Sequence, residues 1–186
     1  MTSVPFSVCV YCGARDGAKK SYKAAAEAMG NAIAREGWRL VYGAGDVGIM
    51  GAVAEAATSA GAATLGVIPT HLLDTEAPRG IYGDRIQTET MHERKKVMFM
   101  NADAVVVLPG GAGSLDEFFE VLTWAQLGLH EKPIILLNLD GYWQPLIDLI
   151  DHVIAEGFAS ASLRSLFSVS DSVDDAVARV AAAPHP

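Results

Sequence analysis

The chain has 186 residues, which is enough for one compact domain and short for two. Hydrophobic residues make up 51% of it and charged residues 19%, the proportions of a globular protein with a sizeable core. The formal net charge of −8 argues against general nucleic-acid binding, because phosphate backbones repel an acidic surface. We therefore expect a single domain over residues 1–182, a disordered tail over residues 183–186, and a small-molecule partner.

Apolar stretches in this sequence are short. Runs such as Ile134 to Leu137 cannot cross a bilayer, so we expect no membrane partner. The first ten residues carry no basic residue ahead of their apolar stretch, which disfavours a secretory signal. These features predict a cytoplasmic protein.

Apolar runs bounded by glycine or proline alternate with helical periodicity along the whole chain. The predicted strands cover residues 5–11, 38–42, 63–68, 84–88, 104–108, 133–138 and 166–169. The predicted helices cover residues 20–36, 48–60, 90–101, 114–129, 143–156 and 171–182. This alternation predicts an α/β fold of the Rossmann-like, doubly wound type, with a mostly parallel sheet and helices on both faces. Ligands bind such sheets beyond the carboxyl ends of the strands, where the glycine turns fall.

The first predicted strand carries a CxxC pair, Cys9 and Cys12. Redox CxxC pairs lie at a helix start, whereas Cys9 lies inside a strand, so two reduced packing thiols are the favoured interpretation. There is no second cysteine pair, and the five histidines are scattered, so we predict no metal and no cofactor.

The second predicted strand leads into a turn with the pattern GxGxxG, residues 43–48. A dinucleotide-binding turn would follow the first strand, and an acidic residue would end the next strand, where this chain has Ile68-Pro69-Thr70. NAD or NADP binding is therefore disfavoured. A tight turn that shapes a nucleotide pocket, with Gly43 and Gly45 in the pocket wall, is the better interpretation.

The most informative stretch, PGGAGSLDE at residues 109–117, joins the strand at 104–108 to a helix. Its glycines let backbone N–H groups approach a ligand, and the positive end of the helix dipole favours a phosphate. Upstream, MHERK at residues 91–95 supplies cations that can complete such a site. Read alone, Arg94 and Lys95 are better explained as part of a solvated cationic surface run.

Two roles are open for Glu117. Ser114 and Glu117 have the spacing of a capping box, in which the serine hydroxyl bonds the N3 amide and the glutamate reaches back to the serine N–H. A carboxylate near a helix start is also favoured by the helix dipole. Local physics therefore does not separate a helix cap from a catalytic carboxylate.

The helix predicted at 114–129 has two apolar faces. One contains Leu115 and fits an ordinary core stripe, and the other contains Val121, Trp124 and Gly128. The sheet can cover only one face. The second therefore indicates a homodimer interface close to the site, with Trp124 near it, unless a neighbouring helix of the same chain covers it.

The MHERK and PGGAGSLDE segments together resemble the LOG family of cytokinin-activating phosphoribohydrolases, which have often been labelled lysine decarboxylases. The resemblance extends from VYCGAR at residues 10–15, through residues 41–51, to residues 123–142. Two departures replace one small residue by another: Ala44 stands where the family has a third consecutive glycine, and Ser114 stands where threonine is usual.

The resemblance implies hydrolysis of the N-glycosidic bond of a purine ribonucleoside 5′-monophosphate. It implies cytokinin-type N6-substituted nucleotides as substrates, with AMP as a second substrate. In this scheme Glu117 supplies the negative charge that stabilises an oxocarbenium-like sugar, and Arg94 keeps that carboxylate ionised and aligned. The implied substrate-binding set is Glu76, Arg94, Lys95, Gly111, Ala112, Gly113, Ser114, Leu115, Asp116, Glu117 and Thr123.

Three other classes of protein are alternatives. Carriers of the molybdenum cofactor share this fold and glycine turn and would bind a phosphate without hydrolysis, but the presence of both Arg94 and Glu117 disfavours them. A dehydrogenase would need the ribose-binding acid that this sequence lacks. A literal lysine decarboxylase would need a pyridoxal-phosphate site, for which the sequence has no independent signature.

Overall fold

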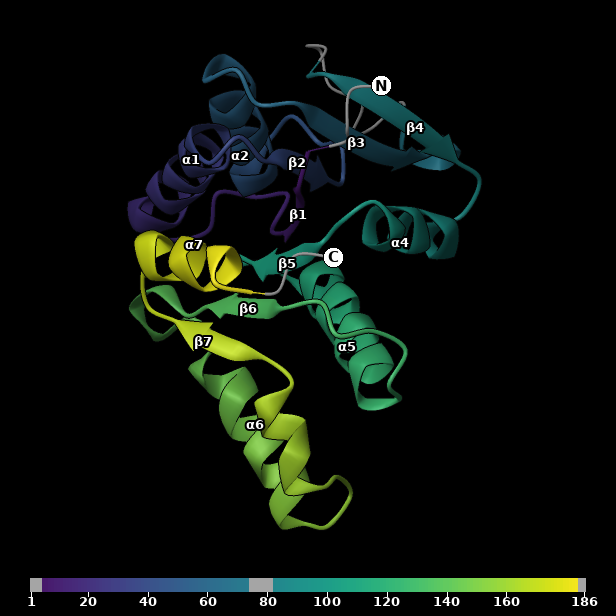
Figure 1. Cartoon of the computed structure of the whole chain (residues 1–186), viewed down its shortest axis with the longest axis vertical. Coiled ribbons are helices and arrows are strands. Elements are labelled where there is room, and N and C mark those ends of the chain that lie inside the picture. Colours follow the sequence, from purple (N-terminus) through teal and green to yellow (C-terminus); the bar gives the residue numbers. More distant parts are fainter. Residues whose placement is uncertain (1–4, 74–81, 184–186) are drawn as a thin grey trace.

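The computed structural model describes residues 5–73 and 82–183 (Figure 1). The strands are β1 (Ser7–Tyr11), β2 (Arg39–Tyr42), β3 (Thr64–Pro69), β4 (Asp84–Thr88), β5 (Ala104–Val107), β6 (Ile134–Leu137) and β7 (Ser168–Ser170). The α-helices are α1 (Lys20–Arg35), α2 (Gly48–Ser59), α4 (Met91–Met100), α5 (Ala112–Gln126), α6 (Gln144–Ala155) and α7 (Val173–Ala181). Short 3₁₀ turns form η1 (Thr70–Leu72), η2 (Leu139–Gly141) and η3 (Ala161–Ser165).

The seven described strands form one sheet in the order β4-β3-β2-β1-β5-β6-β7, and every pair is parallel. The chain builds outward from β1 to β4, then returns to the other side of β1 and builds outward to β7. This is the predicted doubly wound α/β fold, and the strand order reverses between β1 and β5. The parallel sheet requires helical crossovers, which is why strands and helices alternate in the sequence.

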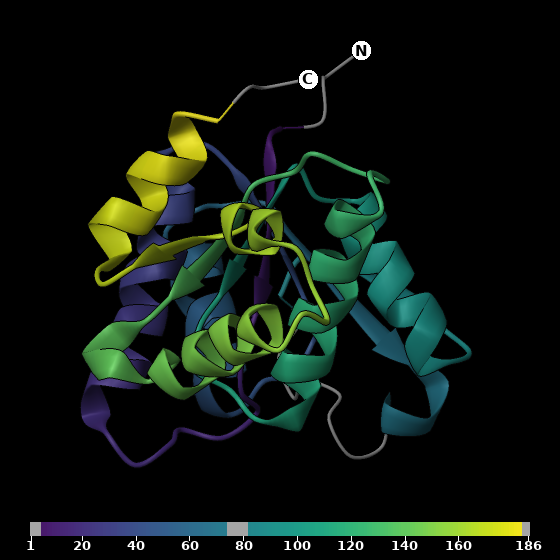
Figure 2. The same ribbon diagram turned by 90° about the horizontal axis from the view of Figure 1, so that it is seen from below.

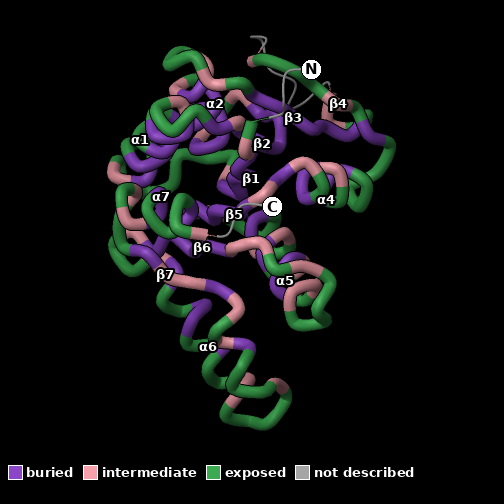
Figure 3. The backbone as a smooth tube through the Cα atoms, in the orientation of Figure 1, coloured by how far each residue is buried: buried purple, intermediate pink, exposed green. Residues whose placement is uncertain are grey.

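Helices cover both faces of the sheet, and alternate strand residues point to each. Val8 and Val10 of β1 pack with α1, α2 and α7, whereas Cys9 and Tyr11 pack with α4, α5 and α6. Figure 2 shows α1 and α7 on one side of the sheet and α4 and α5 on the other. Of the strands between them, β1, β2, β3, β5 and β6 are buried along most of their length (Figure 3), which explains why they read as continuous apolar runs, whereas the edge strand β4 is largely exposed.

Every predicted strand and helix is present, with ends within three residues of the prediction. The start of α5 differs in a way that matters for the site. The Gly111 carbonyl accepts the Leu115 N–H at 3.1 Å, so the helix begins at Ala112 and Ser114 lies inside its first turn. The capping box predicted for Ser114 and Glu117 is therefore wrong, because its N-cap position belongs to Gly111.

A capping box does occur, at the start of α4. The Thr90 hydroxyl accepts the Glu93 N–H at 3.2 Å, and the Glu93 carboxylate accepts the Thr90 N–H at 3.2 Å. The box fixes the first turn of the helix that carries Arg94 and Lys95. At the other end of the chain, Ala183, the first residue of the predicted tail, still donates its N–H to the Val180 carbonyl; the other three residues of that tail lie outside the described residues.

Candidate active site

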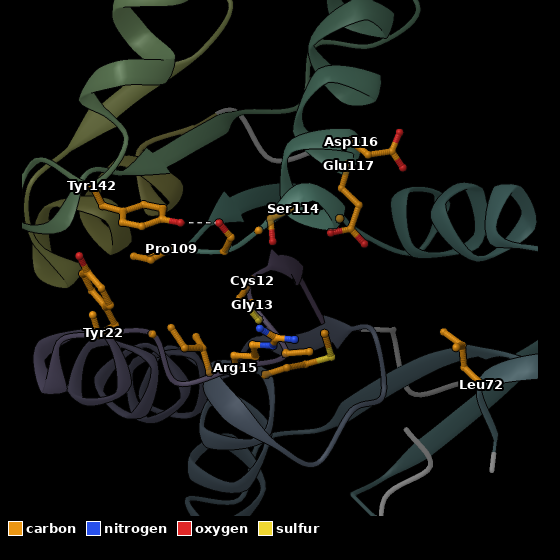
Figure 4. A pocket seen from close by; sticks show the side chains of 18 of the residues that line it. Cys12, Gly13, Arg15, Tyr22, Leu72, Pro109, Ser114, Asp116, Glu117 and Tyr142 are labelled. Carbon is orange, nitrogen blue, oxygen red and sulfur yellow. Dashed lines mark hydrogen bonds between the residues drawn. The ribbon is translucent and has the colours of Figure 1, made fainter. Parts of the chain in front are cut away.

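A cavity of about 640 Å³ opens at the carboxyl ends of β1 and β5, where the strand order reverses (Figure 4). This is the position at which doubly wound sheets bind ligands, and the volume is that of a small-molecule site. The lining comes from the loop after β1, the starts of α1, α2, α4 and α5, the turn after β5, η1 and the residue that follows η2. Segments distant in the sequence therefore meet around one space.

The glycine turn after β5 lies against this cavity. α5 has Gly111 at its N-cap and no side chain bonded to its first amides. A Cβ placed on Gly111 or Gly113 would meet nothing within 4 Å, so the backbone there is open to a ligand. Because the first N–H groups of a helix lack intrahelical acceptors, the turn presents donors and a positive dipole end suited to an anion.

The carbonyls of the same turn are held by the protein. The Tyr142 hydroxyl donates to the Gly110 carbonyl at 2.5 Å (dashed in Figure 4), and the Gly13 N–H donates to the Pro109 carbonyl at 3.1 Å. Tyr142 also packs edge-on against Tyr22, with ring centroids 5.4 Å apart. These contacts fix the turn before any ligand arrives.

Glu117, in the second turn of α5, points into the cavity (Figure 4). Asp116 also lines the cavity, but its carboxylate is directed away from Glu117 and pairs with Lys95. Burial raises the pKa of the Glu117 carboxyl to about 7, against a smaller lowering by Arg94. Arg94 lowers this pKa, as expected, but desolvation outweighs the attraction of the guanidinium, so Arg94 by itself does not hold the carboxyl ionised below about pH 7. A carboxyl with a pKa near 7 is suited to acid–base work at physiological pH.

Arg94 is buried, and backbone carbonyls fix its guanidinium. Nε donates to Val67 O at 3.1 Å and Nη2 donates to Gly43 O at 2.6 Å, which ties the group across the ends of β2 and β3. A Cβ on Gly43 would collide with this guanidinium. Gly43 is expected in the cavity wall, but the structure places it behind Arg94, and it is Arg94 that lines the cavity.

Gly45 also lies one layer behind the cavity. Its N–H points to the sulfur of Met50 at 3.1 Å, and Met50 is the residue that lines the space. Between the two glycines, Ala44 adopts a left-handed backbone with a φ of 61°, which favours glycine. Its methyl group fits because the neighbouring residue on β3 is Gly66, where a Cβ would lie 2.8 Å from that methyl group.

The helix that follows the GxGxxG turn, α2, does not present its first amides to a ligand. At the start of α2, Ile49 donates its N–H to Arg15 O at 3.4 Å and Met50 donates to Gly13 O at 3.1 Å. Gly48, with a φ of 64°, brings the backbone so close that a Cβ would lie 2.5 Å from Ala14 C. The amides that would bind a pyrophosphate are already used, which agrees with the sequence argument against NAD.

Lys95 lies behind the cavity rather than in its wall. Its side chain is 6% exposed, and Nζ forms ion pairs of 2.9 Å with both Asp116 and Glu120. Three other members of the implied substrate-binding set, Ala112, Leu115 and Thr123, also fall outside the lining, and Glu76 lies outside the described residues. The turn residues Gly111, Gly113 and Ser114, with Arg94, Asp116 and Glu117, do come together around the space.

The loop after β1 contributes to the cavity wall, although none of its residues was predicted in the site. Residues 12–15 and 17–18 line the cavity, together with Tyr22 and Tyr142. A usable signal existed, because the loop directly follows the first strand and strand ends carry the ligand site in this fold. Cys12 is part of this wall. Burial raises the pKa of its thiol, and it is a free cysteine, as is Cys9.

The second apolar stripe of α5 is mostly covered within the chain. Val121 is 1% exposed in the core, and Trp124 packs edge-on against Phe99 of α4 with ring centroids 5.0 Å apart. Gly128 follows the helix with a φ of 71° and is exposed. The interpretation of Val121 as an interface residue is wrong, because its side chain is already buried in the core of the chain.

Within residues 5–73 and 82–183, no group of three or more His, Cys, Asp or Glu side chains converges in a way that could hold a metal ion. The described helices also include none with the length and apolarity to span a bilayer.

Comparison with known proteins matches residues 50–180 to the family described as "Possible lysine decarboxylase". The cytokinin riboside 5′-monophosphate phosphoribohydrolase of Rhodococcoides fascians is 44% identical over 179 residues, covering 95% of this chain and 89% of that protein. The phosphoribohydrolase LOG5 of Arabidopsis thaliana is 41% identical over 175 residues, covering 94% and 77%.

Among solved structures, the molybdenum cofactor carrier protein of Chlamydomonas reinhardtii superimposes with a TM-score of 0.72 at 23% identity, over 95% of this chain and 96% of the other. At that identity the likeness concerns the fold alone. The sequence relatives identify a family, which the fold match does not. The chain belongs to the LOG family, and the two relatives named above are phosphoribohydrolases.

Proposed function

We propose that this protein hydrolyses the N-glycosidic bond of cytokinin riboside 5′-monophosphates, and of AMP, to the free base and ribose 5-phosphate. One observation carries the proposal: α5 presents both its free N-terminus and Glu117 to the same cavity. At 1.5 Å per residue, Glu117 lies roughly 6–8 Å along the axis from the first amides. That spacing suits a sugar held by its 5′-phosphate at the helix start with its anomeric carbon beside the carboxylate.

In the proposed reaction the phosphate binds the amides of the Gly111–Ser114 turn. The bond between the anomeric carbon and the base nitrogen breaks, and the base leaves with the bonding electrons and gains a proton from solvent, to which Glu117 later returns the proton that it takes from water. The ionised form of Glu117 stabilises the cationic sugar and takes a proton from the water that attacks the anomeric carbon. Arg94 fixes the cavity wall beside that carboxyl group.

The direct test is to assay free base from AMP, isopentenyladenosine monophosphate and adenosine. Because binding of the remote phosphate is used to orient the reacting sugar, activity on the monophosphates should exceed activity on the nucleoside by orders of magnitude. Comparable rates on AMP and adenosine would contradict the proposal. The alternative, a nucleotide or molybdenum-cofactor binding protein without catalysis, predicts nucleotide binding with no release of base in the same assay.

The assembly proposed here is a homodimer with Trp124 near its interface, and the proposed location is the cytoplasm. Trp124 is half-buried, and large apolar side chains are exposed at the end of α4, within α5 and just after α5: Met100, Phe119, Leu127 and Leu129. Exposed apolar groups clustered on neighbouring elements are typical of subunit contacts.

Sedimentation tests the dimer. Leu127→Glu places a charge in the proposed contact and should shift the protein to a monomer, because desolvating that charge is costly. Phe158→Glu is the matched control, since Phe158 is 86% exposed at the far end of α6 and its variant should remain dimeric. A monomeric wild-type protein would rule out the assembly.

A further inference from the structure

Lys95 occupies an unusual position for a lysine, because its side chain is 6% exposed and bridges two helices. Nζ lies 2.9 Å from a carboxylate oxygen of Asp116 and 2.9 Å from one of Glu120. Lys95 belongs to α4, and both carboxylates belong to α5. The contact therefore joins the helix that carries Arg94 to the helix that carries Glu117.

The two paired carboxylates flank Glu117 along α5. Asp116 precedes it by one residue, and Glu120 follows it by three, which places Glu120 on the neighbouring part of the helix surface. Three acidic residues within five positions repel one another, and that repulsion disfavours the ionised form of Glu117. The opposing cations are Arg94 and Lys95, both from the first turns of α4.

From the opposite side, β1 presents groups that carry no charge at neutral pH. Burial raises the pKa values of Cys9, Tyr11 and Cys12, so all three remain protonated. The charge balance around Glu117 is therefore set by α4 and by its own helix.

We propose that Lys95 is a positioning residue that clamps α5 to α4 and offsets the charges of Asp116 and Glu120, so that Glu117 can act as an anion beside the substrate. The inference rests on the proposed function and replaces direct substrate contact as the role of Lys95. An ammonium group has three N–H donors, and two of those of Lys95 are used in charge-assisted bonds. Turning Nζ toward a phosphate would leave both carboxylates unpaired.

Lys95→Met tests this assignment through a pH profile. Removal of the cation leaves Asp116 and Glu120 uncompensated, so the pKa of Glu117 rises and the limb on which kcat increases with pH moves up by about 1 pH unit. Turnover at pH 7 should fall about fivefold and recover at higher pH, with KM for AMP changed less than about threefold. A substrate contact would instead raise KM at every pH without recovery, and that result would overturn the proposal.

Two further variants and a control test the same charge balance. Glu120→Gln removes one repelling charge and should move the limb in the opposite direction, to lower pH, even if Lys95→Met fails to fold. Lys95→Arg keeps the cation and should retain most of the wild-type profile. Lys96→Met is the matched control, because Lys96 is an exposed neighbour on α4 and its loss should leave the limb in place.

A titration without substrate separates this proposal from the proposed reaction. The Glu117 carboxyl, followed by carbon-13 NMR in labelled protein, should titrate at higher pH in Lys95→Met and at lower pH in Glu120→Gln than in the wild type. These shifts are expected even if the protein hydrolyses nothing. An unchanged Glu117 titration in both variants would overturn the role of Lys95, whatever the activity.

Discussion

Two glycine turns in this molecule each join a strand to a helix, but only one of them leaves the first amides of its helix open to a cavity. The turn after β2, residues 43–47, leads into α2, and the turn after β5, residues 108–111, leads into α5. At α2 the first amides donate to the carbonyls of Gly13 and Arg15, whereas at α5 the first turn faces a cavity. A strand, a glycine turn and a helix start therefore do not by themselves make an anion site.

The difference arises from β1, which lies between β2 and β5 in the sheet. The chain leaves β1 to enter α1, and α1 packs beside α2 on one face. The connecting loop therefore runs across the start of α2, and its backbone carbonyls accept hydrogen bonds from the first amides of that helix. The start of α5 lies on the other face, so the same loop forms the opposite wall of an open cavity.

The largest effect should follow from Glu117→Gln, which removes the group that α5 has and α2 lacks. The amide cannot carry a negative charge, so turnover of AMP should fall by about 10²-fold or more, the scale of a lost acid–base group. Glu27→Gln, at an exposed site on α1, is the control for the same chemical change. Near-normal turnover by a folded Glu117→Gln protein would remove Glu117 from the mechanism.

The same variant should gain stability at high pH. The folded-state pKa of Glu117 is raised to about 7 from an ordinary value of 4.5, so its favourable contribution is complete below pH 4.5 and is lost as pH rises through 7. At pH 8 the glutamine variant should therefore be more stable than the wild type, by up to about 3 kcal/mol. Urea unfolding at pH 5 and pH 8 measures the gain, which should shrink markedly at the lower pH.

A pair of glycine substitutions tests the comparison between the turns. Gly48→Ala forces a side chain into a left-handed backbone and against Ala14, and should cost about 2–4 kcal/mol of stability. Gly113→Ala meets no neighbour and lies in a helix, so stability should hold or rise by up to about 1 kcal/mol. Its methyl group instead obstructs the anion site, so KM for AMP should rise about tenfold.

Thermal unfolding and steady-state kinetics on both variants decide this test. If Gly113→Ala lost stability while keeping its KM, the turn after β5 would be a structural turn like the one after β2.

The smallest effect is expected from Tyr142→Phe. This change removes the hydroxyl that donates to the Gly110 carbonyl and leaves the packing against Tyr22 in place. Loss of one hydrogen bond of about 1 kcal/mol should loosen the turn and raise KM for AMP about fivefold, with kcat nearly unchanged. An equal rise in KM for adenosine and for AMP would show that the Tyr142 hydroxyl does not act through the phosphate site.

Much of the fold could be predicted from the sequence, because helix and strand periodicity are local properties. Thirteen alternating segments predicted a doubly wound sheet, and each of them is present. The glycine turn before α5 was found in the same way, since glycines between a strand and a helix have a local physical meaning, whereas the role expected of Glu117 came from the family resemblance. The start of α5 was misplaced by two residues, because the sequence offers Ser114 as a cap and the backbone of Gly111 takes that position instead.

The sequence by itself determined the order of strands and helices, the glycine turns and the motifs that reveal the family. Only the tertiary structure decided which turn is open, that Val121 is buried in the core, that Lys95 pairs with Asp116 and Glu120, and that burial raises the pKa of Glu117 to about 7. Periodicity and turn chemistry depend on neighbours along the chain. Desolvation, ion pairing and the filling of a helix terminus depend on neighbours in space, which the packing of the whole sheet brings together.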